Sequence, residues 1–228
     1  MRWSEHKTTV PCDNRPKAQT GAAMTRGTIV ALMLAGGLIS AAPALAQSKL
    51  DIACAGSAGA TIEQRIAACT RIIASGRGTA HDHAVAFNYR GGAFYYKGQV
   101  ERAMADYEQA IKLDPHYAHA YNNRCWSGAV LGRTEQAAAD CTRVLKLYNV
   151  ANTFENRGFI YLKRGEFDRA IADYEAGLRL DPPNKADFLY GRGLAKTKKG
   201  DASGAADIAA AKAIKPEIAE DFAKYGVK

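Results

Sequence analysis

The histidines are the first residues of this sequence whose type and spacing could support chemistry. His81 and His83 form an H-x-H pattern in a segment that we predict to be a polar loop, and His116 and His119 lie three positions apart. Either pair could supply two ligands to a metal ion, but a closed structural zinc site takes about four. We therefore interpret both pairs as solvated side chains and expect neither a metal nor any other cofactor.

The sequence also gives little support for nucleophilic, redox or acid–base catalysis. No cysteine lies in a C-x-x-C pair, which would lower the pKa of a thiol. The sequence contains no G-x-S-x-G, H-E-x-x-H or P-loop pattern. We interpret the following acidic residues as solvated faces of outer helices with Lys or Arg nearby: Asp106, Glu108, Asp140, Asp173 and Glu175. The sequence therefore predicts a protein that is not an enzyme, with a catalytic or redox role as a remote alternative.

The charge balance argues against nucleic acid as a partner. The whole chain has 31 basic and 23 acidic residues, a formal net charge of +8. Residues 1–46 hold five of the Lys and Arg and two of the Asp and Glu, which leaves 26 against 21, or +5, for the rest. Nucleic-acid-binding proteins normally cluster a larger basic surplus on one face, so we expect no nucleic acid partner.

The N-terminal part predicts export. A basic start at residues 24–26 is followed by an apolar run over residues 29–39, and residues 44–46 form a small-x-small cleavage pattern. This predicts a signal peptide over residues 24–46, cleaved after Ala46, a periplasmic mature protein and no membrane span after cleavage. An uncleaved anchor is the alternative, although the run is much shorter than the roughly 20 residues of a membrane span. Residues 1–23 show no periodicity, and we expect them to be untranslated or disordered.

Residues 84–115 predict a helix, a turn at Gly98 and a second helix that Pro115 ends. Apolar residues recur at three- and four-residue steps on both sides of the turn. Large residues alternate with small ones, namely Phe87, Phe94 and Tyr107 with Gly91, Ala103 and Ala110. Each helix carries an apolar stripe that needs a partner, so we expect a stacked array of helical hairpins.

The same landmarks return 67 residues later, which is two periods of about 34. They fall on Phe154, Gly158, Tyr161, Ala170, Tyr174, Gly177 and Pro182. Residues 61–73 predict a further helix that Thr61 caps, and residues 217–225 predict a final capping helix. We divide the chain into a leader region over 1–46, an N-terminal capping half-repeat over 47–83, repeat units 1, 2 and 3 over 84–117, 118–150 and 151–184, and a degenerate unit 4 with the capping helix over 185–228.

This spacing resembles the tetratricopeptide repeat, which has large residues at positions 4, 11 and 24, small ones at 8, 20 and 27 and a proline at 32. The resemblance covers roughly residues 84–216 and implies an all-α superhelix of helix-turn-helix repeats. Much of the chain is similar to small exported bacterial proteins of this family. Unit 2 departs from the pattern, with Cys125 at position 8, Gly128 at 11, Cys141 at 24 and Asn149 in place of proline.

The resemblance also implies how the cysteines pair. Positions 8 and 24 of a repeat lie opposite each other in its hairpin, so we predict a disulfide between Cys125 and Cys141. Cys69 falls at position 24 when residues 69–73 are laid on 141–145, which favours a second disulfide with Cys54. An oxidising compartment would preserve both bonds, and each would stabilise the fold by about 3 kcal/mol. The alternative is four buried free thiols.

By the same resemblance, the first helix of each unit lines a concave groove. The implied partner-binding residues are Asn88, Tyr95, Tyr96, His119, Asn122, Asn123, Trp126, Asn152, Glu155, Asn156, Lys163, Tyr190 and Lys198. Asparagine amides could pair with an extended peptide backbone, and exposed Trp and Tyr are common interface anchors. The alternative for the aromatic residues is packing between repeats.

Some repeat proteins of this family clamp the acidic tails of chaperones with lysine, asparagine and arginine. Asn123 resembles the asparagine of that set, but Asn88 and Asn156 stand where the lysine and the arginine would be. We therefore expect an exported adaptor or scaffold that binds a different peptide or partner protein, of unknown identity, in its concave groove. The alternative is a cell-envelope assembly factor that binds polysaccharide or peptidoglycan, with aromatic residues stacking on sugars.

Overall fold

The computed structural model describes residues 52–56 and 59–227. The predicted signal peptide and the rest of residues 1–51 lie outside this part of the chain. A short helical turn over 52–55 precedes the long helices. These are α2 (Ile62–Ala74), α3 (Ala80–Tyr96), α4 (Val100–Leu113), α5 (Ala118–Val130), α6 (Thr134–Leu145), α7 (Ala151–Lys163), α8 (Phe167–Leu178), α9 (Lys185–Lys199), α10 (Gly204–Ile214) and α11 (Ile218–Ala223).

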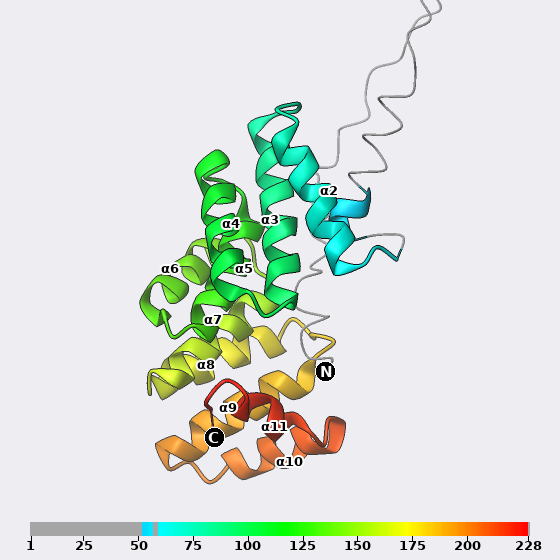
Figure 1. Cartoon of the computed structure of the whole chain (residues 1–228). Helices are drawn as coiled ribbons and strands as arrows, with labels where there is room; N and C mark the ends of the chain where they lie inside the picture. Colours follow the sequence, from blue (N-terminus) through cyan, green and yellow to red (C-terminus); the bar gives the residue numbers. More distant parts are fainter. Residues whose placement is uncertain (1–51, 57–58, 228) are drawn as a thin grey trace, which may run out of the picture.

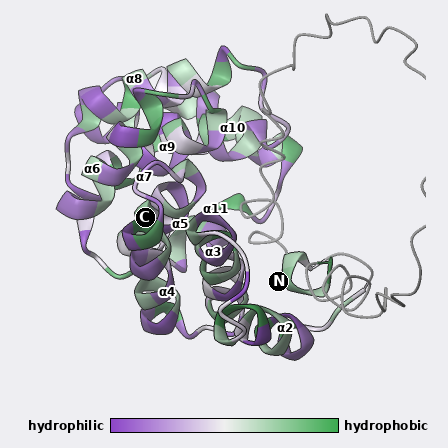
Figure 2. Cartoon of the chain, turned by 90° about the horizontal axis from the view of Figure 1, so that it is seen from above, coloured by the Kyte–Doolittle hydropathy of each residue, from purple (hydrophilic) through white to green (hydrophobic). Residues whose placement is uncertain are grey.

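Consecutive helices pair as hairpins, and the hairpins stack one on the next. Helix α2 lies at one end of the stack, and α9 and α10 lie at the other (Figure 1). Helices α3 with α4, α5 with α6, α7 with α8 and α9 with α10 make the most extensive contacts, and each hairpin also packs on its neighbour. Each helix carries both hydrophilic and hydrophobic residues (Figure 2), as expected for helices that bury one face. The predicted all-helical stack is confirmed, and the described residues contain no strand.

Threonine caps start the first two long helices. Thr61 caps α2, and its hydroxyl and the Gln64 side chain each bond the other residue's backbone N–H. Thr79 and Asp82 form the same reciprocal arrangement at the start of α3. Because this cap starts α3 at Ala80, the H-x-H pattern lies in its first turn, and the prediction of a polar loop there was wrong.

The contact inside each hairpin explains why small and large residues alternate. A Cβ atom added to Gly91 would lie 2.7 Å from the Tyr107 ring, and one added to Gly158 would lie 3.3 Å from the Tyr174 ring. Glycine therefore lets the tyrosine of the second helix approach the backbone of the first in units 1 and 3. At the same two positions, unit 2 has the cysteines.

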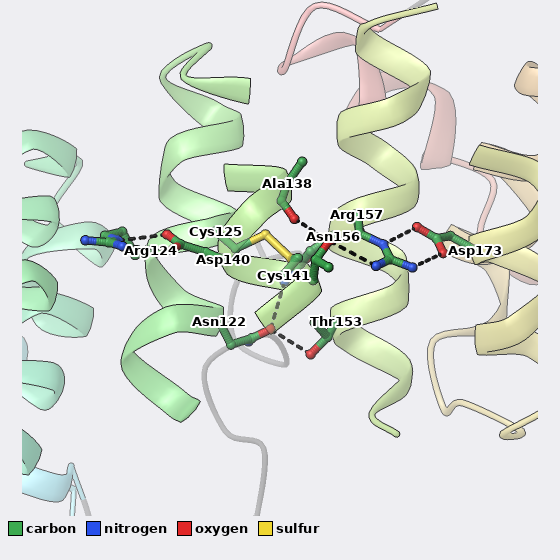
Figure 3. Close-up of a disulfide and its surroundings, with 11 residues drawn as sticks. Asn122, Arg124, Cys125, Ala138, Asp140, Cys141, Thr153, Asn156, Arg157 and Asp173 are labelled. Atoms are coloured by element: carbon green, nitrogen blue, oxygen red, sulfur yellow. Dashed lines mark hydrogen bonds and ion pairs between the residues drawn. A yellow bond between two sulfur atoms is a disulfide. The ribbon is translucent and has the colours of Figure 1, made fainter. Parts of the chain in front are cut away.

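Those cysteines are joined by a disulfide (Figure 3). The Cα atoms of Cys125 and Cys141 are 5.6 Å apart. A second disulfide joins Cys54 to Cys69, with Cα atoms 4.8 Å apart, and ties the turn over 52–55 to α2. The four cysteines of the described residues are thus paired as the sequence predicted. In unit 2 a covalent bond between the two helices replaces the glycine–tyrosine contact of its neighbours.

A buried ion pair also joins the two helices of each hairpin. An arginine of the first helix makes two hydrogen bonds of 2.7–2.8 Å to one carboxylate of the second: Arg90 to Asp106, Arg124 to Asp140, Arg157 to Asp173 and Arg192 to Asp207. Asp106, Asp140 and Asp173 are only 6%, 5% and 5% exposed. The interpretation of these three as solvated surface residues was therefore wrong. Sequence spacing alone did not reveal that each carboxylate faces an arginine of the preceding helix.

Two of these arginines also reach the preceding hairpin. Arg90 donates from Nη1 to the Thr70 hydroxyl at 3.2 Å, and Arg157 donates to the Thr142 hydroxyl at 3.1 Å. Figure 3 shows Arg157 beside Asp173. A single guanidinium thus fixes three helices, because its planar group offers five N–H donors in a rigid geometry.

We expect Asp173→Ala to lower the free energy of unfolding by about 2–3 kcal/mol, because it leaves the largely buried Arg157 without its carboxylate. Urea denaturation followed by far-UV circular dichroism measures the change. The matched control is Asp168→Ala in the same helix, where the carboxylate is 77% exposed. It should cost less than about 0.5 kcal/mol. Equal losses in the two variants would contradict a structural role for the buried pair.

Candidate partner-binding surface

The predicted groove residues lie along the first helices of the hairpins, α3, α5, α7 and α9, which form the inner wall. Their exposure differs widely. Six are buried: Asn88, Asn122, Trp126, Glu155, Asn156 and Tyr190. Six are half-buried, namely Tyr95, Tyr96, His119, Asn123, Asn152 and Lys163, and Lys198 is exposed.

The asparagines bond across the inner wall. Asn123 donates from Nδ2 to Asn88 Oδ1 at 2.9 Å, and Asn88 donates to the Tyr117 hydroxyl at 3.4 Å. One hairpin further on, the Thr153 hydroxyl donates to Asn122 Oδ1 at 2.8 Å (Figure 3). Because these bonds join successive first helices, the buried amides hold neighbouring hairpins in register.

Two charged members of the predicted set, Glu155 and Lys163, are also engaged. Asn184 donates from Nδ2 to a carboxylate oxygen of Glu155 at 2.8 Å. The Lys163 ammonium donates to the Ala129 carbonyl at 3.1 Å, and burial lowers the pKa of this lysine. Glu155 and Lys163 thus have contacts within the inner wall.

The C-terminal segment, residues 218–227, lies on the inner wall. Phe222 of α11 is 1% exposed. Its ring centroid lies 4.9 Å from that of Tyr190 on α9 and 5.8 Å from that of Phe159 on α7. Figure 1 shows α11 beside α9 at the C-terminal end of the stack. The predicted capping helix therefore covers part of the surface that was expected to bind a partner.

Tyr225 extends this cover as far as α5. Its ring centroid lies 5.3 Å from that of Trp126 and 6.2 Å from that of Phe159. Trp126 Nε1 donates to the Tyr95 hydroxyl at 2.6 Å, and burial raises the pKa of Tyr95. Trp126, the expected anchor for a partner, is thus packed by aromatic residues of its own chain.

Ion pairs hold the segment in place. The Asp221 carboxylate lies 2.6 Å from Lys215 Nζ and 2.7 Å from Lys224 Nζ. Burial favours a higher pKa for Asp221, but hydrogen bonds from these two lysines outweigh it, and the pKa lies below its usual value. Asp221 therefore stays ionised at neutral pH and fixes α11 after the turn at Pro216.

Part of the inner wall stays accessible near the start of α5. We call Tyr117, His119, Asn123 and Asn152 the open wall, since all four side chains are half-buried. The His119 ring lies 5.4 Å from the Tyr117 ring. Burial lowers the pKa of His119, so its imidazole is neutral at physiological pH. The open wall thus offers neutral donors and acceptors.

The two histidines of the H-x-H pattern contact groups of their own chain. His81 Nδ1 lies 2.6 Å from Asp114 Oδ2, and His83 Nε2 lies 2.8 Å from the Arg77 carbonyl. Within residues 52–56 and 59–227, no three His, Cys, Asp or Glu side chains are grouped to hold a metal ion. The same part of the chain has no helix with the length and apolar character that a membrane span requires.

Sequence reasoning missed the covering of the inner wall, although one signal pointed to it. Ile218, Phe222 and Tyr225 fall on one face of the last helix. An apolar face with two aromatic rings needs a substantial surface to cover it, more than a helix at the edge of the last hairpin provides. The pattern did not say which surface that would be.

We expect Phe222→Ala with Tyr225→Ala to expose Trp126 to solvent, because these rings cover the indole. Trp126 and Trp3 are the two tryptophans of the chain. Acrylamide should quench the double variant more strongly than the parent, and the emission maximum should move to longer wavelength, as fluorescence titration can measure. Glu220→Gln, at an exposed position of α11, is the control and should leave the emission unchanged. Equal quenching of the parent and the double variant would contradict the observed packing.

Comparison with known proteins shows which families and proteins this chain resembles. Residues 91–124 match a family model described as TPR repeat, and residues 157–220 match one described as tetratricopeptide repeat. The Hsp70-Hsp90 organizing protein of Triticum aestivum is 33% identical over 115 residues, 50% of this chain and 19% of that protein. Hsp70-Hsp90 organizing protein 3 of Arabidopsis thaliana is 29% identical over 103 residues, 45% of this chain and 18% of that protein. The chain thus spans less than a fifth of the length of these relatives.

Solved structures show the same fold. YrrB, described as a TPR protein with an unusual peptide-binding site, superposes with a TM-score of 0.61 at 18% identity, over 79% of this chain and 95% of that one. MamA from Desulfovibrio magneticus RS-1 gives a TM-score of 0.63 at 15% identity, over 78% of this chain and 96% of that one. Together with the two matched segments, the stacked hairpins identify the chain as a tetratricopeptide-repeat protein.

Proposed function

We propose that this protein is an exported adaptor or scaffold that binds a peptide segment or a partner protein at the open wall. The observation that carries the proposal is the division of the inner wall into two parts. Its C-terminal part, around Trp126 and Phe159, is covered by residues 218–227. Its earlier part, at Tyr117, His119, Asn123 and Asn152, keeps accessible side chains.

The chemistry of the open wall favours an uncharged stretch of peptide. Asparagine side chains can both donate to and accept from a peptide backbone. Tyr117 adds an amphipathic ring of the kind that is enriched at protein interfaces. The lowered pKa of His119 keeps its imidazole neutral. A segment that presents backbone amides and an apolar side chain would therefore fit this surface better than an acidic tail.

We do not propose that this protein organises Hsp70 and Hsp90, the role that the names of the relatives describe. A clamp for acidic tails needs cations on the inner wall. Here Asn88 and Asn156 stand at two of the clamp positions, and both are buried. A mostly neutral open wall instead supports a different class of partner.

Export rests on two independent observations. The basic, apolar and small-x-small pattern over residues 24–46 is typical of a cleaved signal peptide. The two disulfides are typical of a protein that resides in an oxidising compartment such as the periplasm. Together they favour a mature protein that begins at Gln47.

A photo-crosslinking amino acid at position 152 should capture a discrete protein in intact cells, because that position lies on the open wall. The control is the same group at position 112, an exposed lysine of α4. The expected result is a protein adduct at position 152 that is absent at 112, seen on a denaturing gel and identified by mass spectrometry. Identical adducts from both positions would contradict the proposal. An adduct that a muramidase releases would favour the glycan-binding alternative instead.

Intact-mass measurement of the protein from the cell envelope should give residues 47–228, lighter by the hydrogen atoms lost in two disulfides. Reaction with iodoacetamide under denaturing conditions should add nothing before reduction and should modify four cysteines after it. A mass that includes residues 24–46 would indicate an uncleaved anchor. Alkylation of Cys125 or Cys141 before reduction would contradict the pairing.

A further inference from the structure

A second concave surface lies across α6, apart from the inner wall. It is a cleft of about 930 Å³ between the side chains of α5, α6, the C-terminal end of α7 and the start of α8. Ala138 and Ala139 line it on α6, Tyr121 lines it from α5 of the same hairpin, and Tyr161 lines it from α7 of the next hairpin. The aromatic residues that pack against the C-terminal segment are not among its lining residues. We call this surface the α6 cleft.

The α6 cleft exists because unit 2 has small side chains where its neighbours have large ones. Ala138 stands where unit 1 has Met104 and unit 3 has Ile171. The disulfide between Cys125 and Cys141 holds α5 to α6 without the tyrosine that does so in the flanking hairpins. These residues are particular to unit 2 and do not follow from the repeat pattern.

The rim of the α6 cleft carries an excess of positive charge. Arg143 and Lys146 lie on it, are exposed and have no carboxylate partner among the described residues. Arg164 and Arg169 share a single carboxylate, Glu166, with N–O distances of 2.5 Å. One carboxylate for two guanidinium groups leaves one positive charge uncompensated there.

Two further features favour a free positive charge at the rim: Arg143 is held in place, and a nearby acidic residue of the other units is missing. The Arg143 guanidinium lies 4.6 Å from the centroid of the Tyr121 ring and donates to the Pro115 carbonyl at 2.9 Å. Its position is thus set before any ligand binds. Thr142 stands where units 1 and 3 have Glu108 and Glu175, so the acidic residue of the neighbouring units is missing from this surface.

We propose that the α6 cleft binds an acidic segment of a partner protein in an extended conformation. Carboxylates of the segment would pair with Arg143 and Lys146 at one end and with Arg164 and Arg169 at the other. An aliphatic side chain between them would rest on Ala138 and Ala139. This site is separate from the open wall and does not depend on it.

The shape of the surface favours peptide over nucleic acid. Single-stranded nucleic acid needs a groove that tracks a regular phosphate backbone, with exposed rings on which bases stack. Here the cations come from two places in the fold, the C-terminal end of α6 and the junction of α7 with α8, and Tyr121 and Tyr161 are buried, each beneath an arginine. Side chains two positions apart in an extended peptide point to the same side, so an acidic, an aliphatic and an acidic residue at every second position match that arrangement.

The test is fluorescence anisotropy with the oxidised full chain and a labelled eight-residue peptide in which glutamate, leucine and glutamate occupy every second position, with serine between them. Arg143→Gln and Lys146→Gln should each weaken binding about three- to tenfold, as expected for loss of a partly screened ion pair. Raising the salt concentration should weaken it further. Arg143→Gln introduces the residue that unit 1 carries at this position, Gln109, so the fold should tolerate it.

Two controls separate charge from shape. Lys112→Gln changes the lysine at the corresponding position of unit 1, outside the α6 cleft, and should leave binding unchanged. Ala138→Ile keeps every charge but fills the hollow with the residue of unit 3, and should weaken binding at least as much as Arg143→Gln. A thermal melt by circular dichroism confirms that each variant is folded.

Several outcomes would overturn the proposal. The first is that a peptide with glutamine in place of glutamate binds as tightly as the acidic peptide. The second is that Lys112→Gln weakens binding as much as Arg143→Gln, and the third is that folded Ala138→Ile binds as tightly as the parent. The fourth is that the acidic peptide does not bind at millimolar concentration. Tighter binding of a single-stranded oligonucleotide through Arg143 and Lys146 would assign the surface to nucleic acid. Because the open wall contributes no residue to this assay, failure here leaves the crosslinking result at position 152 unaffected.

Discussion

The stack depends on one repeated interaction, the arginine of each first helix bound by two hydrogen bonds to the aspartate of the second. A buried carboxylate is stable only when paired, and a guanidinium satisfies it with two parallel bonds. Hydrogen bonds to the aspartates raise the pKa of Arg124, Arg157 and Arg192, so these arginines stay charged over the whole physiological range. Where the same arginine also bonds the preceding hairpin, as Arg157 does with Thr142, the pair sets both the geometry within a hairpin and the spacing between hairpins.

Unit 2 shows how a repeat can change its surface while keeping this pair. Arg124 and Asp140 remain, but a disulfide between Cys125 and Cys141 takes the place of the glycine and tyrosine of units 1 and 3. A covalent link restrains the two helices in the unfolded chain as well as in the folded one. With the hairpin held in this way, α6 can present small residues such as Ala138 without loss of the helix pair. The hollow that results is bordered by cations and lies apart from the inner wall.

The inner wall itself is shared between the protein's own C-terminus and the surface left for a partner. Phe222 and Tyr225 pack on the part that carries the aromatic rings of Trp126, Phe159 and Tyr190. Large exposed apolar patches are unfavourable in water, and covering one with a segment of the same chain costs little entropy once the last hairpin has formed. The amides nearer the N-terminus bond one another and remain partly accessible. A partner that bound as we propose would meet a polar open wall, because the aromatic part of the inner wall is already covered.

The sequence by itself determined the helices, their pairing and the cysteine bonds, because these depend on local periodicity and on neighbouring positions of a repeat. Thr61 as a cap, the turn at Gly98 and the opposition of Cys125 and Cys141 could all be predicted in this way. Only the tertiary structure decided which groups face one another across helices: Asp173 against Arg157, and Tyr225 against Trp126. An amphipathic pattern shows that a face must be covered, but it carries no information about the distant segment that covers it. For that reason the buried aspartates were predicted to be exposed, and the expected anchor at Trp126 proved to be part of the core.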